Sequence, residues 1–177
     1  LLPNYDVFDE HRYFFNGADV GVYKLTYNNI KIKIGLQICE DLWDDNQELK
    51  VSEEQKKNGA EILINISASP FSIGKLEKRI KLIKKKIKEL KLPFIYCNMV
   101  GAQDEIIFDG SSLAFSSNGS LIKQADYFKE CISVINSNVK KSCSVIFQKK
   151  EKKIFNALCL GVSDYFSKTG HKEAVLG

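Results

Sequence analysis

The residues with the clearest potential for chemistry lie at the end of one apolar run. The segment Lys31–Trp43 reads KIKIGLQICEDLW, in which alternating isoleucines stop at Cys39 and an acidic pair, Glu40 and Asp41, follows. This alternation predicts a buried strand that delivers the thiol to the point where the chain turns. Catalytic nucleophiles are often held at such a turn, because the strand fixes the sulfur while the turn exposes it. The alternative is a structural cysteine, since free cysteine is among the most often buried residue types.

A cysteine hydrolase needs a thiolate, a base that takes its proton, and donors that hold the developing oxyanion. Cys39 could supply the thiolate, and the backbone N–H of Glu40 could help to hold the oxyanion. Both histidines are weak candidates for the base. His11 lies in an acidic and aromatic segment, and His171 lies far along the chain beyond a polar stretch. A pair of Cys39 with His11 stays open as the weaker alternative.

Composition indicates one globular domain, or one domain with part of another. The chain has 177 residues, of which 44% are hydrophobic and 27% are charged, and no apolar run is long enough for a membrane span. Five cysteines form no CxxC pair, which argues against a zinc site and favours a reducing cytoplasm. Cys97 and Cys159 lie in apolar runs, so we expect both to be structural.

The net charge of +4 comes largely from one segment, Lys75–Lys91. Its apolar residues recur at spacings of four and three, so they form one stripe of a helix while the lysines fill the other face. No aromatic residue is interleaved for base stacking. A solvated helix face is therefore expected rather than a nucleic-acid site.

Periodicity and turn residues predict a mixed sheet. Strands are expected at 19–24, 30–38, 61–67, 93–98, 106–108, 111–116, 120–123 and 131–135, and helices at 47–58, 75–91 and 151–168. The pairs Asn28–Asn29 and Asn118–Gly119 predict hairpin turns. Strands that alternate with helices and then form a meander imply an α/β fold with helices on one face. Residues 136–150 are expected to be a linker, and 171–177 the start of another strand.

Several long segments together resemble one family. ICEDLW around Cys39 resembles the nucleophile motif of the nitrilase, or carbon–nitrogen hydrolase, superfamily. LPNYDVFDEHRYF (2–14), NISASPFSIGK (65–75) and PFIYCNMVGAQDEIIFDGSS (93–112) are similar to the glutaminase domain of glutamine-dependent NAD synthetases. IFNALCLGVSDYFSKTGHKEAVLG (154–177) looks like the opening of the ammonia-dependent synthetase domain of that family. These segments follow the family order and cover nearly the whole chain.

The resemblance implies a fold and a division into domains. It implies a nitrilase-like αββα sandwich that is incomplete, without its N-terminal strands and helices. The first helix and strand of a synthetase domain of the adenine-nucleotide alpha-hydrolase type would follow. Residues 1–147 would then be the C-terminal part of the glutaminase domain, and residues 148–177 the linker and the start of the NAD synthetase domain.

The resemblance also implies roles for individual residues. Cys39 would attack the side-chain amide of glutamine, form a thioester and release ammonia. Tyr5, Ser69 and Lys75 would bind glutamine, the lysine being suited to its carboxylate. On the pattern alone, Ser69 is a turn former and Lys75 belongs to a solvated helix. Glu10 is a weaker candidate for an orienting glutamate of this superfamily, with a surface charge as the equal alternative.

Other parts of the family's machinery are expected outside this chain. The catalytic glutamate and lysine of the family precede the LPNY motif, and its ATP loop, SGGxDS, follows VLG. We therefore expect no cofactor or metal in this chain, ATP and Mg²⁺ in the parent synthetase domain, and no activity of the chain alone. Ala102 replaces a frequent glycine, a mild departure.

For the whole enzyme, the resemblance implies a cytoplasmic homo-oligomer that amidates nicotinic acid adenine dinucleotide to NAD, without nucleic-acid or membrane partners. The alternatives are a stand-alone carbon–nitrogen hydrolase acting on another amide, and a non-enzymatic module.

Overall fold

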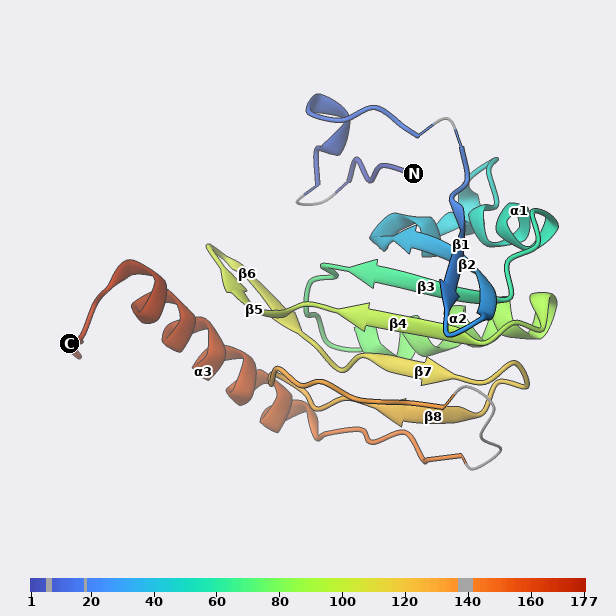
Figure 1. The fold of residues 1–177 in the computed structure, drawn as a ribbon. Helices are drawn as coiled ribbons and strands as arrows, with labels where there is room; N and C mark the ends of the chain where they lie inside the picture. The colour runs from blue at the N-terminus through green and yellow to red at the C-terminus, as the bar shows by residue number, and fades with distance from the viewer. Residues whose placement is uncertain (6–7, 18, 137–141) are drawn as a thin grey trace.

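A six-stranded mixed sheet organises the chain (Figure 1). The computed structural model describes residues 1–5, 8–17, 19–136 and 142–177. The strands of the sheet, in spatial order, are β1 (Val22–Tyr27), β2 (Ile30–Ile38), β3 (Ile62–Ser67), β4 (Phe94–Asn98), β7 (Leu113–Phe115) and β8 (Leu121–Gln124). A separate two-stranded sheet consists of β5 (Val100–Gln103) and β6 (Ile106–Asp109). The helices are α1 (Val51–Lys57), α2 (Lys75–Leu90) and α3 (Lys150–Thr169), with short 3₁₀ turns η1 (Glu10–Arg12), η2 (Cys39–Leu42) and η3 (Asp44–Asn46).

Strand direction in the large sheet follows from the connections. Strands β2, β3 and β4 are parallel because α1 and α2 carry the chain back between them. The pairs β1–β2, β4–β7 and β7–β8 are antiparallel. The two predicted hairpins are confirmed: Asn28 and Asn29 have φ values of 47° and 61°, and Gly119 has 85°. Asparagine and glycine tolerate this left-handed region better than other residues.

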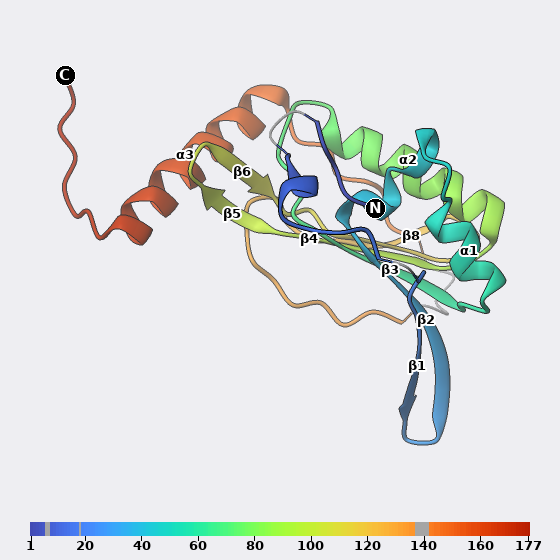
Figure 2. The ribbon, with the colours of Figure 1, turned by 90° about the horizontal axis from the view of Figure 1, so that it is seen from above.

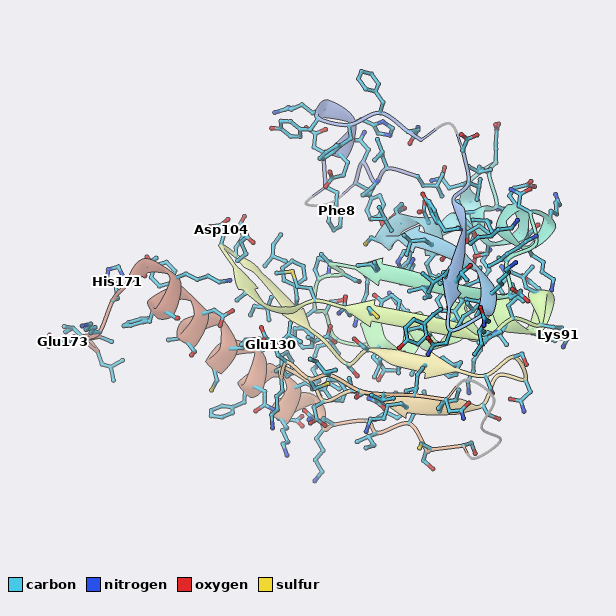
Figure 3. All side chains as sticks on the ribbon, viewed as in Figure 1. Phe8, Lys91, Asp104, Glu130, His171 and Glu173 are labelled. Carbon is cyan, nitrogen blue, oxygen red and sulfur yellow. The ribbon has the colours of Figure 1, made fainter. Side chains whose placement is uncertain are left out.

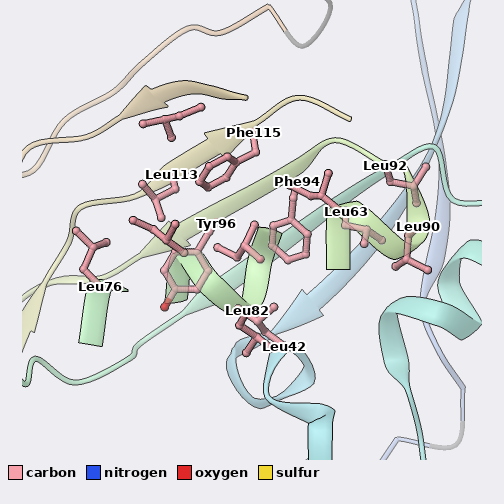
Figure 4. Close-up of a cluster of buried hydrophobic side chains, with 14 of the residues drawn as sticks. Leu42, Leu63, Leu76, Leu82, Leu90, Leu92, Phe94, Tyr96, Leu113 and Phe115 are labelled. Carbon is pink, nitrogen blue, oxygen red and sulfur yellow. The ribbon is translucent and has the colours of Figure 1, made fainter. Parts of the chain in front are cut away.

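The core lies between the sheet and the two helices that cover one of its faces (Figures 2 and 4). The predicted apolar stripe of α2 is confirmed, since its leucines and isoleucines are buried against Leu63, Phe94 and Tyr96. Burial of one such side chain stabilises a fold by roughly 1.5–3 kcal/mol. The stripe therefore fixes the position of α2, and so of the segment that connects it to β3.

The opposite face of β2–β4 has no helix over it in Figure 2. Leu36, Ile38 and Ile66 point to this face and are 37%, 70% and 53% exposed. The mixed sheet with helices on one face is as predicted, and the described residues supply one helix layer of the expected sandwich. Cys97 and Cys159, which the sequence predicts to be structural, are both exposed in the described part of the chain.

Two strand predictions are wrong, and one strand is missed. Residues 131–135 form no strand, and Ile132 and Val134 are 100% and 99% exposed. Residues 171–177 also form no strand, whereas β5 was not predicted. Alternation of apolar residues indicates which face a strand would bury, but a strand also needs a neighbour that accepts its hydrogen bonds.

Within the described residues, no helix is long and apolar enough to cross a membrane.

The predicted helix at 151–168 is confirmed as α3, which packs on β5 and β6. The carboxylate of Asp164 accepts a 2.7 Å hydrogen bond from the Ala102 N–H, and the Lys168 ammonium donates to the Ala102 carbonyl. The predicted linker at 136–150 falls partly outside the described residues. Its described part runs beside β8, where the Cys143 N–H donates to the Leu121 carbonyl.

A buried ion pair ties α2 to the turns that follow Cys39. Lys86 donates to Asp44 at 2.5 Å, and their side chains are 2% and 0% exposed. The neighbouring pair of Lys85 and Asp45 makes a similar contact at the surface. Removing one partner of a buried pair leaves a charge without compensation. The buried pair of Lys86 and Asp44 therefore fixes η3 against α2, whereas the surface pair contributes little to stability.

Lys86→Met is expected to lower the free energy of unfolding by about 3–5 kcal/mol, because it leaves the Asp44 carboxylate buried and unpaired. Lys85→Met, on the same helix one residue away, is the matched control and should leave it nearly unchanged. Urea denaturation followed by circular dichroism measures both. Equal effects of the two substitutions would contradict the assigned role of the buried pair.

Candidate active site

The carboxyl ends of the parallel strands bring the polar residues of the site together. The register pairs Ile38 with Ile66 and Ser67 with Asn98, so β2, β3 and β4 end at the same edge of the sheet. In α/β sheets, ligands bind at this edge. Cys39 follows β2 directly, and Ser69 follows β3 by two residues.

Cys39 lies where β2 turns into η2, as the sequence predicts. Its φ is 36°, in the left-handed region that residues other than glycine seldom adopt. The Asp41 carboxylate accepts a 2.9 Å hydrogen bond from the Ile38 N–H and so stabilises the turn. An unusual backbone conformation of this kind persists only where the surroundings enforce it, and such residues cluster at functional sites.

A cavity of about 550 Å³ opens beside the turn. Cys39 and Glu40 line it together with Ala68, Glu10 and apolar residues of the N-terminal segment. One of these apolar residues is Phe8, which Figure 3 labels. A volume of this size accommodates a small molecule. The predicted residues Cys39 and Glu10 therefore share one cavity, although Glu10 comes from η1 and lies far from Cys39 in sequence.

Tyr5, Glu40 and Lys75 form the charged part of the site. The Tyr5 hydroxyl donates a 2.7 Å hydrogen bond to a carboxylate oxygen of Glu40, which is 5% exposed. Burial raises the pKa of Glu40, and the Tyr5 hydroxyl and the Lys75 charge act against this rise. Burial and the nearby Arg79 lower the pKa of Lys75, whose ammonium lies 4.5 Å from the centre of the Trp43 ring.

The environment of Cys39 favours the protonated thiol. Burial raises the pKa of Cys39, and the carboxylate of Glu40 adds to the rise. Hydrogen bonding of the sulfur with the Ser67 side chain and the Ala68 backbone, together with the Lys75 charge, acts against this rise of the pKa. The net rise means that little thiolate exists near neutral pH, so a base is needed to take the proton.

A network of hydrogen bonds between buried polar side chains lies next to Cys39. Gln55 donates to the Leu36 carbonyl at 2.8 Å, and Gln37 donates to the side-chain oxygen of Gln55 at 2.9 Å. Asn65 donates to Gln37 at 3.4 Å, and the Ser67 hydroxyl donates to Asn65 at 2.6 Å. Because each side chain of this network is held by a hydrogen bond to the next, the network orients Ser67 beside the thiol of Cys39.

These supporting residues were not predicted from the sequence. Asn65 and Ser67 are buried and alternate with isoleucines along β3, and Tyr96 and Asn98 share that buried face on β4. Polar residues at buried strand positions were the available signal, because such positions are normally apolar unless the polar groups bond one another. Periodicity alone assigned the whole run to the core.

The other residues predicted for the site are Glu40 as an oxyanion donor, Ser69 as a ligand-binding residue, and the two histidines as the weaker candidates for the base. Glu40 is the second residue of η2, and the first N–H groups of a helix have no acceptor within it, so the oxyanion role stays a prediction. Ser69 is buried, and its hydroxyl oxygen accepts from Arg79.

Neither histidine is a base for Cys39: His11 is exposed on η1, and His171 stacks on Tyr165 beyond α3, far from the cavity (Figure 3).

Comparison with known proteins defines the class. The family described as "Carbon-nitrogen hydrolase" matches residues 2–142, so the chain belongs to this family. More narrowly, it is similar to glutamine-dependent NAD(+) synthetases: it is 37% identical to that of Synechocystis sp. over 191 residues, and 30% identical to that of Thermotoga maritima over 216 residues. These matches cover 100% and 99% of the chain but 33% and 36% of the relatives, so the chain spans about a third of their length.

Solved structures give the same result. The glutamine-dependent NAD+ synthetase of Acinetobacter baumannii matches 96% of the chain with a TM-score of 0.79 and 30% identity, and the match covers 32% of that protein. A carbon–nitrogen hydrolase of Helicobacter pylori G27 matches 73% of the chain with a TM-score of 0.61 and 27% identity, over 47% of its own length. The nitrilase-like α/β fold is therefore shown, and the segment beyond the family match is shared with the synthetases.

The charges around Cys39 predict opposite effects of two substitutions on its pKa. Alkylation by iodoacetamide, followed by mass spectrometry of the Cys39 peptide across pH, should show a midpoint above the usual value of about 8.5. Glu40→Gln should lower the midpoint because it removes a negative charge, and Lys75→Met should raise it because it removes a positive one. A native midpoint at or below 8.5, or shifts of the same sign, would contradict the described electrostatics.

Proposed function

We propose that this chain is the nucleophile-bearing part of a glutamine-hydrolysing NAD(+) synthase. The observation that carries the proposal is the placement of Cys39 at a strained strand end, in a cavity that also holds the Glu40 carboxylate. The similarity over 99–100% of the chain to glutamine-dependent NAD(+) synthetases supports this activity rather than another amide hydrolysis.

In the proposed reaction, the sulfur of Cys39 attacks the carboxamide carbon of glutamine, and the thiol proton passes to a base. The oxyanion that forms accepts a hydrogen bond from the Glu40 N–H. Collapse of this intermediate breaks the carbon–nitrogen bond; the nitrogen takes up the proton and leaves as ammonia, and a thioester on Cys39 remains. Water then hydrolyses the thioester to glutamate and restores the thiol. The resemblance assigns the base to a glutamate outside this chain.

Polar groups near Cys39 suit the charged α-carboxylate of glutamine. Lys75 carries a positive charge that acts on both Cys39 and Glu40, so a bound carboxylate near Lys75 would be stabilised. Ser69 and Tyr5 would supply hydrogen bonds. Glu10, which lines the same cavity as Cys39, would orient the reacting groups.

The ammonia would serve a second site in the same protein. There it would amidate nicotinic acid adenine dinucleotide in an ATP-dependent step, with residues 148–177 beginning that domain. The resemblance assigns ATP and Mg²⁺ to that synthetase domain. A cytoplasmic homo-oligomer would follow from the same family.

A stand-alone carbon–nitrogen hydrolase is the second candidate, favoured by the structural match to the Helicobacter pylori enzyme over 73% of the chain. It accounts for the sheet and for Cys39 but makes no use of α3. Dependence of NAD formation on glutamine distinguishes the two candidates.

In the full-length protein, Cys39→Ser is expected to reduce glutamine-dependent NAD formation at least about a thousandfold, because the nucleophile is lost. NAD formation from added ammonium should be unchanged, since that reaction bypasses the thiol. Cys131→Ser, at an exposed cysteine, is the matched control and should behave as the native protein. Undiminished use of glutamine by Cys39→Ser would disprove the proposal, and absence of NAD formation from either nitrogen source in the native protein would favour the second candidate.

A further inference from the structure

Ser69 is held through each of its polar atoms. Its N–H donates to the side-chain oxygen of Asn98 at 3.0 Å. Its carbonyl and its hydroxyl oxygen accept from the same terminal nitrogen of Arg79, at 2.8 and 3.1 Å. The same nitrogen also lies 3.4 Å from the Pro70 carbonyl. Ser69 is 2% exposed, so water does not compete for these bonds.

A buried ion pair closes these contacts into a ring. The other terminal nitrogen of Arg79 lies 2.8 Å from a carboxylate oxygen of Asp109, and the two side chains are 0% and 3% exposed. Asn98 donates to the same oxygen at 3.2 Å. The ring therefore joins the loop after β3, helix α2, strand β6 and strand β4. We call these four residues, Ser69, Arg79, Asp109 and Asn98, the loop clamp.

Stability alone is a poor explanation for the loop clamp. Burying two charges costs about as much as their attraction returns, and apolar residues of similar size are often as stable. The Nε atom of Arg79 is also buried without a hydrogen-bond partner, which carries a further cost. A guanidinium, however, presents several donors in a fixed plane, so it can hold a loop and a carboxylate at the same time.

The loop clamp fixes two predicted binding residues relative to each other. Lys75 and Arg79 lie four residues apart on α2, so they share one side of the helix. Arg79 reaches back to Ser69, and the Lys75 N–H donates to the Ser72 carbonyl at 3.1 Å. Hydrogen bonds therefore hold both ends of the loop between Ser69 and Lys75 against α2.

The loop clamp also sets the direction of the hydrogen bonds of Ser69. A guanidinium can only donate, so the hydroxyl oxygen of Ser69 receives from Arg79 and its own proton is left for an acceptor. Toward a ligand, the Ser69 hydroxyl can therefore donate its proton to an oxygen, such as that of a carboxylate.

We propose that Arg79 and Asp109 are positioning residues that hold Ser69 as a hydrogen-bond donor for the carboxylate of glutamine beside Lys75. This inference rests on the proposed function, because it takes glutamine as the ligand. Neither Arg79 nor Asp109 is among the residues that line the cavity, and Arg79 bonds the loop, so they act through the loop and affect binding rather than bond breaking.

The test removes both charges together in the full-length protein, with Arg79→Met and Asp109→Leu combined so that no buried charge is left unpaired. The KM for glutamine should rise about tenfold, as for loss of one hydrogen bond to a charged group, while kcat changes less than about threefold. NAD formation from ammonium should be unchanged, and urea denaturation followed by circular dichroism shows whether the glutaminase part is folded. Lys81→Met, at an exposed lysine of α2, is the control and should leave KM unchanged.

Coupling to Ser69 separates positioning from a general structural role. Ser69→Ala alone should raise the KM for glutamine by a similar factor, and adding it to the double variant should cause no further rise. If the double variant fails to fold, Arg79→Lys is used instead. This substitution keeps the positive charge but loses the several donors of the guanidinium, so it should raise the KM for glutamine by a similar factor. An unchanged KM in a folded variant, or additive effects, would overturn the inference. A native protein that releases no ammonia from glutamine would instead overturn the proposed function on which it rests.

Discussion

Parallel pairing of β2, β3 and β4 is the constraint on which the candidate site depends. It makes three strands end at one edge of the sheet, so that Cys39, Ser67 and Asn98 meet although up to 59 residues separate them in sequence. The pairing in turn requires helices as connections, and the apolar stripe of α2 anchors one of them over the sheet. A slip of one residue would turn every side chain of a strand to the other face, so the register is strongly specified.

The buried face of the sheet changes character along the strands. Near the strand starts it is apolar, with Leu63 and Phe94 against α2. Toward the carboxyl ends it becomes polar, with Asn65, Ser67 and Asn98 in hydrogen-bonded networks. The apolar half supplies stability, whereas the polar half fixes orientations at the cost of desolvation. This division leaves the thiol and the loop after β3 in a rigid setting, as a site that works by preorganisation requires.

Local sequence signals predicted much of the fold, and tertiary contacts decided the rest. The strand that ends at Cys39, helix α2 and the hairpin at Asn118 follow from periodicity and turn residues, which act over a few positions. The run at 131–135 has the alternation of a strand but forms none, and its Ile132 and Val134 side chains are fully exposed, so alternation alone did not decide the structure. The roles of Tyr5, Ser69 and Lys75 came from the family resemblance, because no local pattern distinguishes them from turn or surface residues. Arg79 and Asp109 could not be predicted, since only the fold brings them together.

Covalent labelling by an electrophile shaped like glutamine tests the central claim most directly. With the full-length protein, such a reagent should modify Cys39 at one equivalent per chain, and excess glutamine should slow the reaction. The exposed cysteines in the described part of the chain, such as Cys131 and Cys159, should remain unmodified and can be followed in the same mass spectrum. Modification spread over the exposed cysteines, or labelling of Cys39 that glutamine does not slow, would contradict a glutamine site at the end of β2.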